Sequence, residues 1–399
     1  MKTPETIYHH LIDSFTRQGV CFALYRLPWT DEPILVMQEE GKPILLNSLE
    51  ELNQRKGFLL SPFQLTDTRP AILIRPDIVA HDWEEIKQVL QEWMTRHPAS
   101  INPMQTLPQN EADTVAQPTE KEEKEQYTET FSRFILPLKE KQFRKLVLSR
   151  SSTQTVQKAF SPLTTFIQAC NSYPRMMISL CHTPSTGTWI GSTPEIILSG
   201  HEKEWHTVAL AGTMPMQGEV MPTEWSKKNK EEQAFVGEYI RKTVKKFGSK
   251  LTEKGPYTAR AGQLVHLKTD FHFTLKDTTH LGNVLQELHP TPAVCGLPKE
   301  EAYQFILQTE PHDRLFYSGI IGWIDPQGDT TLYVNLRCMH VEGNTATLYA
   351  GGGILPPPPP SRFRMGRNAA ENEYNAKYPV NLKHIKESCT LTKKISCSS

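Results

Sequence analysis

Short runs of strand-forming residues dominate this chain, and they arrive in adjacent pairs joined by short connections. Helix-type segments intervene at irregular intervals, the clearest of them at 83–96 and 224–246. A doubly wound parallel sheet needs strands and helices in regular alternation, whereas neighbouring strands with short links favour antiparallel pairing. The pattern therefore predicts an α+β fold with large antiparallel sheets. The main runs are VCFALYRL, PILVMQ, GFLL, AILIRP, KLVLSR, MMISLCH, WIGSTPEIILSG, QLVHLK, LFYSGIIGWID, TTLYVNLRCMHV and TATLYAGGGI.

Bulk composition excludes several classes of partner. The 44 basic and 44 acidic residues cancel to a formal net charge of +0, so nothing indicates binding to nucleic acid or an anionic membrane. No apolar run approaches the ~20 residues that cross a bilayer, and the N-terminal stretch lacks the apolar region of a secretory signal. The 7 cysteines include no CxxC pair, which supports neither a disulfide framework nor a zinc site. We expect a cytoplasmic protein.

Composition shifts along the chain suggest four parts. Residues 98–125 are polar and rich in Pro and Glu, and they separate two regions of β-type pattern. The five prolines after the YAGGGI strand mark a second change of composition. We therefore predict a divergent N-terminal part of the fold at 1–97, a loop or linker at 98–125, a catalytic core at 126–355 and an aberrant tail at 356–399. The lysine- and serine-rich tail has few apolar residues, a composition typical of disorder.

Several polar residues stand out, but each has an ordinary structural explanation. Lys145 begins a strand and Glu195 follows a Thr-Pro pair; both residue types often lie at strand edges. Glu232 is more informative, because Val236, Tyr239 and Ile240 share its face of the predicted helix. A carboxylate on an apolar face needs a partner. Periodicity alone leaves a bound cation and a salt bridge equally open.

Nine blocks in fixed order make this chain resemble the chorismate-utilising enzymes. This family includes isochorismate synthases, salicylate synthases and the large subunits of anthranilate and aminodeoxychorismate synthase. The resemblance covers roughly 127–354 and implies an anthranilate-synthase-component-I-like fold, with helices packed outside the sheets. The blocks are RKLVLSR, IGSTPEIIL, ALAGT, WSKKNKEEQ, HLKT, LHPTPAVCGLP, YSGIIGW, NLRC and YAGGG.

The resemblance also implies a site and a cofactor, Mg²⁺ on the ring carboxylate of chorismate. A nucleophile adds at ring carbon 2 while the carbon-4 hydroxyl leaves, which needs a base and an acid. Lys145 matches the base, Glu195 the acid, Glu232 a metal ligand, and Arg337 the arginine that grips a substrate carboxylate. Further pocket positions match Gly212, Thr213, His266, Ala293, Val294, Gly351 and Gly352.

Lys145 indicates the branch of the family. Members that transfer an amine usually have glutamine there, because ammonia needs no deprotonation. One group of aminodeoxychorismate synthases has a nucleophilic lysine where this chain has Ala211. Both differences point to water as nucleophile and to isochorismate as product, serving menaquinone or siderophore synthesis, without a glutaminase subunit and as a monomer. Elimination to salicylate, amine transfer and an inactive chorismate-binding remnant stay open as alternatives.

The tail departs from the family. A closing helix with a pattern like S-E-W-x-E-T-x-x-K normally follows the glycine-rich strand, and it carries two more magnesium ligands and a lysine that contacts substrate. Here the chain reads SRFRMGRNAAENEY. One nucleotide out of frame, Met365-Gly366 must encode tryptophan, and the surrounding codons permit S-E-W-E-E-T-Q-Q-K-M. We therefore predict a frameshift within 356–361, where a cytosine run can encode the prolines, and an impaired enzyme.

Overall fold

Two nine-stranded sheets form the molecule. The computed structural model describes residues 6–98, 120–156, 160–216 and 218–356. Every described pair of neighbouring strands is antiparallel, as predicted. Sheet A has the order β14 (Gly296–Leu297), β7 (Lys145–Thr155), β18 (Thr345–Ile354), β17 (Cys338–Glu342), β9 (Gly187–Thr193), β8 (Met177–Thr183), β1 (Phe22–Arg26), β2 (Ile34–Met37), β6 (Ile78–His81). Sheet B has the order β12 (Gly248–Ala261), β13 (Leu264–Leu275), β11 (Glu204–Pro215), β10 (Ile196–His201), β16 (Thr330–Val334), β15 (Ile320–Ile324), β4 (Gly57–Ser61), β5 (Ala71–Ile74), β3 (Ile44–Leu46).

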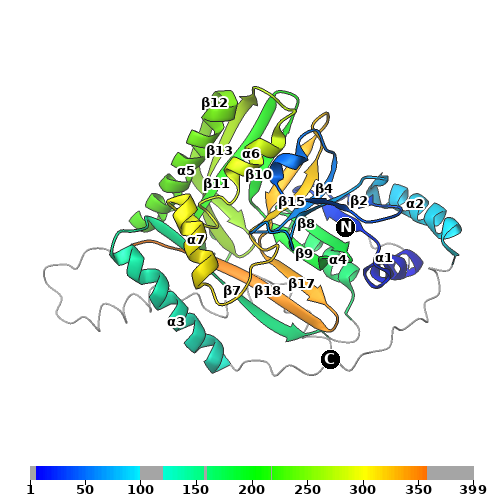
Figure 1. Ribbon diagram of the computed structural model, residues 1–399, viewed down its shortest axis with the longest axis horizontal. Coiled ribbons are helices and arrows are strands. Elements are labelled where there is room, and N and C mark those ends of the chain that lie inside the picture. The colour runs from blue at the N-terminus through cyan, green and yellow to red at the C-terminus, as the bar shows by residue number, and fades with distance from the viewer. Residues whose placement is uncertain (1–5, 99–119, 157–159, 217, 357–399) are drawn as a thin grey trace, which may run out of the picture.

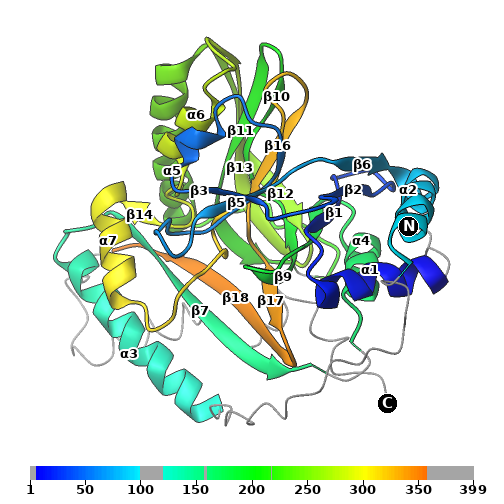
Figure 2. The ribbon, with the colours of Figure 1, turned by 45° about the vertical axis from the view of Figure 1, so that its right-hand side comes forward.

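Helices lie on the outer faces of the sheets, as the resemblance predicted (Figure 1). Sheet A is covered by α1 (Thr6–Gln18), α2 (Asp82–Arg96) and α4 (Pro162–Ser172). Sheet B is covered by α5 (Lys227–Phe247) and α6 (Leu281–Leu288), with the short 3-10 helix η1 (Leu49–Leu52) beside α6. Beside β7 stand α3 (Glu120–Lys139) and α7 (Lys299–Thr309), both visible in Figure 2. None of the helices in the described ranges combines the length and apolar character that a bilayer crossing needs.

The core between the sheets explains why some strands read as unbroken apolar runs. All five residues of β1 are buried. Phe22 and Leu24 pack with the helices outside sheet A, whereas Ala23 and Tyr25 pack between the sheets with Phe58 of sheet B. Because both faces of the strand are covered, alternation of polar and apolar residues is absent. The residues before 97 thus supply strands to both sheets.

Two predicted strands are each divided between the sheets. The run 189–200 forms the end of β9 in sheet A and most of β10 in sheet B, and the run 330–341 forms β16 in sheet B and most of β17 in sheet A. Pro194 interrupts the first run, since proline cannot donate to a ladder. Arg337 has a φ of 50° in the second, a left-handed conformation that ends a strand. Glu195 and Arg337 therefore both lie where the chain crosses between the sheets.

The predicted linker is shorter than 98–125. α3 begins at Glu120, so residues 120–125 are helical, and 99–119 lie outside the described residues. Glutamate and lysine favour helix as well as loop, and composition alone could not separate them. The predicted tail lies outside the described residues from 357 onward. The sequence also gave no signal for β12, because its residues are almost all polar or exposed.

Candidate active site

Lys145 stands at the start of β7 with its side chain fully buried. β7 lies between β14, which pairs with it at Lys145 and Leu146, and β18, which pairs along its length. The Lys145 Nζ lies 3.1 Å from Oε1 of Glu232, and these two side chains are 0% and 9% exposed. Glu232 therefore has the salt-bridge partner that its apolar helix face required.

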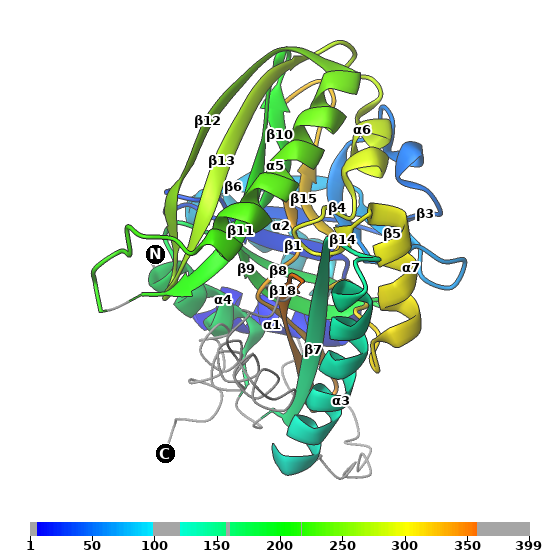
Figure 3. The same ribbon diagram turned by 90° about the vertical axis from the view of Figure 1, so that its left-hand side faces the viewer.

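Helix α5 carries Glu232 across the strands of sheet B (Figure 3). Ser226 caps its start by accepting a bond from the Asn229 N–H (3.2 Å). Gln233 docks the helix onto β11, because its Oε1 accepts from the Ala211 N–H (2.9 Å) and its Nε2 donates to the Ala209 carbonyl (3.0 Å). These bonds satisfy a buried amide that sequence reasoning did not single out.

Two glycines let α5 approach both sheets. Gly212 has a φ of +73°, and a Cβ there would lie 3.0 Å from the Asn229 carbonyl oxygen. On β18, a Cβ at Gly353 would lie 2.1 Å from Glu232 Oε1 and 3.3 Å from Lys145 Cε. Gly353 thus leaves space for the buried ion pair. The sequence signal was the GGG run, but only its first two glycines were assigned to the site.

We expect Gly353→Ala to displace the Glu232 carboxylate and to lower the free energy of unfolding by about 1–3 kcal/mol, as overpacking does. Urea unfolding measures this. The matched control is Gly237→Ala on α5, where the nearest atom to a new Cβ is Phe271 Cζ at 3.8 Å. That variant should match or exceed wild-type stability, because alanine favours helix over glycine. Similar losses in both variants would contradict the close approach at Gly353.

Glu195 is the second buried acid of the site. It is 3% exposed, and its Oε1 accepts a bond from the Thr291 hydroxyl (3.4 Å). Burial raises the pKa of Glu195 to about 7, against the opposing effects of the Lys145 charge and the Thr291 hydrogen bond. The carboxyl group can therefore hold a proton near neutral pH, which a general acid requires.

The raised pKa of Glu195 predicts a pH-dependent stability. Between pH 4.5, the ordinary pKa of a glutamate, and pH about 7, the folded chain keeps a proton that the unfolded chain has released. Rising pH through this window should therefore lower the free energy of unfolding, by on the order of 3 kcal/mol. Glu195→Gln lacks this titration. Its free energy of unfolding, measured in urea, should therefore rise relative to that of wild type from pH 5 to pH 8. Glu231→Gln, on the exposed side of α5, should parallel wild type throughout.

Three predicted substrate-binding residues form one hydrogen-bonded chain. Arg337 Nη2 donates to His266 Nε2 (2.9 Å), so the ring carries its proton on Nδ1, which donates to the Thr213 hydroxyl (3.0 Å). Burial, and then the Arg337 charge, lower the pKa of His266 to about 3. Arg337 Nη1 also donates to the Ala261 carbonyl (2.8 Å). The guanidinium is thus held in one orientation by a neutral histidine.

The remaining predicted positions surround these groups. Val294 is buried and Ala293 half-buried in the loop that begins with Thr291. Gly351 and Gly352 lie on β18 opposite Ser149 and Leu148 of β7. The predicted residues thus lie on β7, β11, β13, β18, α5, the two crossings and the loop that begins with Thr291. The structure also adds Thr291, Gln233 and Gly353.

The described residues do not by themselves fit a magnesium site. Among them, no group of three or more His, Cys, Asp or Glu side chains could hold a metal ion. Mg²⁺ prefers oxygen ligands in near-octahedral arrangement, whereas the Glu232 carboxylate faces the Lys145 ammonium. A cation at Glu232 would compete with that ammonium. The two further ligands that the resemblance implies belong to the closing helix, and this chain lacks the motif of that helix.

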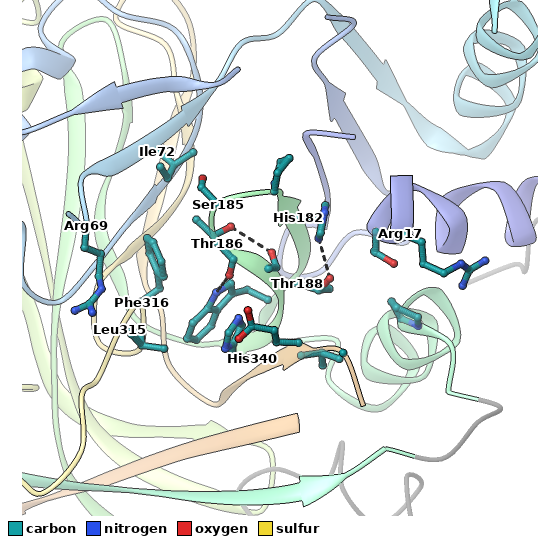
Figure 4. A pocket seen from close by; sticks show the side chains of 18 of the residues that line it. Arg17, Arg69, Ile72, His182, Ser185, Thr186, Thr188, Leu315, Phe316 and His340 are labelled. Carbon is teal, nitrogen blue, oxygen red and sulfur yellow. Dashed lines mark hydrogen bonds between the residues drawn. The ribbon is translucent and has the colours of Figure 1, made fainter. Parts of the chain in front are cut away.

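One cavity of about 1080 Å³ is lined by residues outside this site. Figure 4 shows it around the turn between β8 and β9, where His182 bonds to Thr188. Its lining includes none of the predicted site residues.

Comparison with known structures places the fold. The chain superimposes on the menaquinone-specific isochorismate synthase MenF from Escherichia coli with a TM-score of 0.72 and 19% identity, covering 99% of this chain and 92% of that one. For anthranilate synthase component I from Streptococcus pneumoniae TIGR4, the TM-score is 0.59 and the identity 15%, with 89% and 91% covered. The fold is therefore that of anthranilate synthase component I, as the sequence predicted.

The sequence itself shows the family. Residues 47–361 match the family described as chorismate binding enzyme, and the chain belongs to that family. It is 31% identical over 177 residues to isochorismate synthase EntC of Escherichia coli strain K12, which covers 42% of this chain and 45% of that protein. The chain thus spans about half the length of the curated relatives it matches.

Proposed function

We propose that this chain is an isochorismate synthase, or derives from one, and converts chorismate to isochorismate. Water adds at ring carbon 2 and the carbon-4 hydroxyl leaves. Lys145 takes a proton from the water and Glu195 gives one to the departing hydroxyl. The observation that carries the proposal is Glu195: a fully enclosed carboxyl, within electrostatic reach of Lys145, whose pKa rises to about 7. A carboxyl group of this kind suits general acid catalysis near neutral pH.

The rest of the site supports recognition of a small dianion. Arg337 is oriented by His266 and Ala261, which suits a planar grip on a carboxylate. Gly212, Thr213, Ala293, Val294, Gly351 and Gly352 complete the proposed pocket. Mg²⁺ is the proposed cofactor, with Glu232 as one ligand and the others on the closing helix that only the restored reading frame would encode. We further propose that the protein is a cytoplasmic monomer without a glutaminase subunit. Its product would serve menaquinone or siderophore synthesis.

Impairment of the chain as written is part of the proposal. The family match ends at residue 361, at the end of the proline run where we place the frameshift. The competing function is a non-catalytic protein that binds chorismate. The ion pair between Lys145 and Glu232 favours it, because the carboxylate that would bind the metal already has a side-chain partner.

Product identity tests the proposal. The protein with its reading frame restored should form isochorismate from chorismate, detected by chromatography, in preference to an aminated product even when ammonium salts are supplied. Salicylate as the main product would assign the salicylate synthase branch instead.

Lys145→Gln should shift the restored enzyme toward an aminated product, since ammonia needs no base. The measurement is the ratio of anthranilate to isochorismate at fixed ammonium concentration. Lys242→Gln changes an exposed lysine of α5 and should leave the ratio unchanged. If the restored enzyme with Lys145 already prefers ammonia, the assignment of water as nucleophile is wrong.

A further inference from the structure

A second buried ion pair lies beside β7, outside the proposed acid–base set. Glu310 follows α7, and Arg314 comes four residues later; their side chains are 3% and 2% exposed. Arg314 binds both carboxylate oxygens, with Nε 2.7 Å from Oε2 and Nη2 2.6 Å from Oε1. Burial alone would raise the pKa of Glu310, but the neighbouring Arg314 charge outweighs it, and the pKa of Glu310 is lowered. Both groups are therefore charged at neutral pH.

This pair completes the edge of β7 where its neighbouring strand ends. β14 pairs with β7 at Lys145 and Leu146, and the Val147 N–H then donates to the Cys295 carbonyl (2.8 Å). The Val147 carbonyl accepts a bond from Arg314 Nη2 (2.8 Å). Two residues further along the strand, the Ser149 N–H donates to Glu310 Oε1 (2.7 Å) and its hydroxyl to Oε2 (2.9 Å). The two side chains thus supply an acceptor and a donor in place of a strand.

The same arginine also holds the loop that supports Glu195. Arg314 Nη1 donates to the Val294 carbonyl (2.7 Å). The N–H groups of Val294 and Cys295 in turn bond to the Thr291 carbonyl, at 3.1 and 3.0 Å. Thr291 is the residue whose hydroxyl bonds to Glu195. One guanidinium therefore joins the strand of Lys145 to the loop that contacts Glu195.

We propose that Glu310 and Arg314 act as positioning residues that fix the proposed base relative to the proposed acid. This inference rests on the proposed function for its catalytic consequence, but not for its structural one. A buried bidentate pair with four further bonds to two segments holds both in one geometry. Because acid–base catalysis depends on placement within about 1 Å, a loosened pair lowers turnover more than it lowers substrate affinity.

The first test uses the full chain as it stands. In Arg314→Lys, which keeps the charge but not the fork, hydrogen–deuterium exchange should rise about tenfold or more in peptides spanning 145–150 and 289–295 together. Exchange in β1 and β8 should match wild type. Ser149→Ala removes one bond to Glu310 and should give a smaller rise in 145–150; it carries the test if Arg314→Lys does not fold. A rise in only one segment in Arg314→Lys, no rise in Ser149→Ala, or a uniform rise everywhere overturns the inference.

A second test uses the chain with its frame restored. Arg314→Lys should lower kcat by roughly 10–100-fold while KM for chorismate changes less than about threefold. The matched control is Arg69→Lys, which alters a neighbouring pair with Asp313 (2.6 Å) that is 27% and 51% exposed, and should leave both constants near wild type. Unchanged kcat in Arg314→Lys contradicts the positioning role. If the restored parent enzyme forms no isochorismate, the proposed function alone is contradicted. The exchange experiment still tests whether Glu310 and Arg314 hold the two segments together.

Discussion

Lys145→Ala should lower isochorismate formation by the frame-restored enzyme by ~10² to 10⁴-fold, the range typical of general acid–base groups. It should also destabilise the protein, because Glu232 stays buried without its cation. Removing one partner of a buried pair costs about 3–5 kcal/mol. Turnover at saturating chorismate and urea unfolding measure the two effects. Glu195→Gln should lose turnover to a similar extent and remain folded.

A second substitution separates the two effects of Lys145→Ala. Lys145→Ala combined with Glu232→Gln removes both charges, so stability should largely return while turnover stays low. The matched control is Lys242→Ala, which breaks an exposed pair with Glu238 on the same helix (3.0 Å; 73% and 43% exposed). Exposed pairs contribute 0–1 kcal/mol, and this variant should keep wild-type activity. Near-normal turnover in Lys145→Ala would remove Lys145 from the mechanism.

The sheets were predictable from sequence because their strands follow local rules. β1 and β8 are buried over their whole length, and the short links from β1 to β2 and from β8 to β9 favoured antiparallel pairs. The crossings were only partly predictable from pattern. Pro194 marks where the first run is interrupted, but nothing in the sequence on either side of it shows that β10 joins the other sheet. β12 was missed because its fourteen residues, mostly exposed, lie at the edge of sheet B.

How much of the site could be predicted from the sequence differs from residue to residue. Periodicity showed that Glu232 needs a partner, but a cation and a salt bridge looked the same from one helix face. The partner of Glu232 is Lys145 on β7, which is distant in the sequence, and only the fold brings the two residues together. Arg314 shows the same limit. Glu310 stands four residues before it, but its partners Val147 and Val294 come from distant segments, and no spacing in the sequence connects these two to Arg314.

Restoring the reading frame should have the largest effect on activity. Removing or adding one base in the cytosine run, whichever recovers S-E-W-E-E-T-Q-Q-K, should turn a nearly inactive chain into a magnesium-dependent isochorismate synthase. The described residues offer Glu232 as a metal ligand but no group of three candidate side chains. The restored segment adds two carboxylates and a lysine. Affinity for a divalent cation rises with the number of oxygen ligands, and the lysine compensates substrate charge where it develops.

The comparison needs both proteins at saturating Mg²⁺ and chorismate, with isochorismate measured by chromatography. The unrestored chain should still fold, because the described strands through Ile354 form complete ladders with their neighbours, and circular dichroism checks this. Glu232→Gln in the restored enzyme is the control for the metal: it should raise the Mg²⁺ concentration needed for half-maximal rate, which an inert cation effect would not do. Equal turnover by the two chains would falsify the view that the tail is a functional lesion. A gene whose shifted frame lacks that motif would exclude the frameshift itself, and residues 356–399 would then be a lineage-specific C-terminus that lacks the two carboxylates.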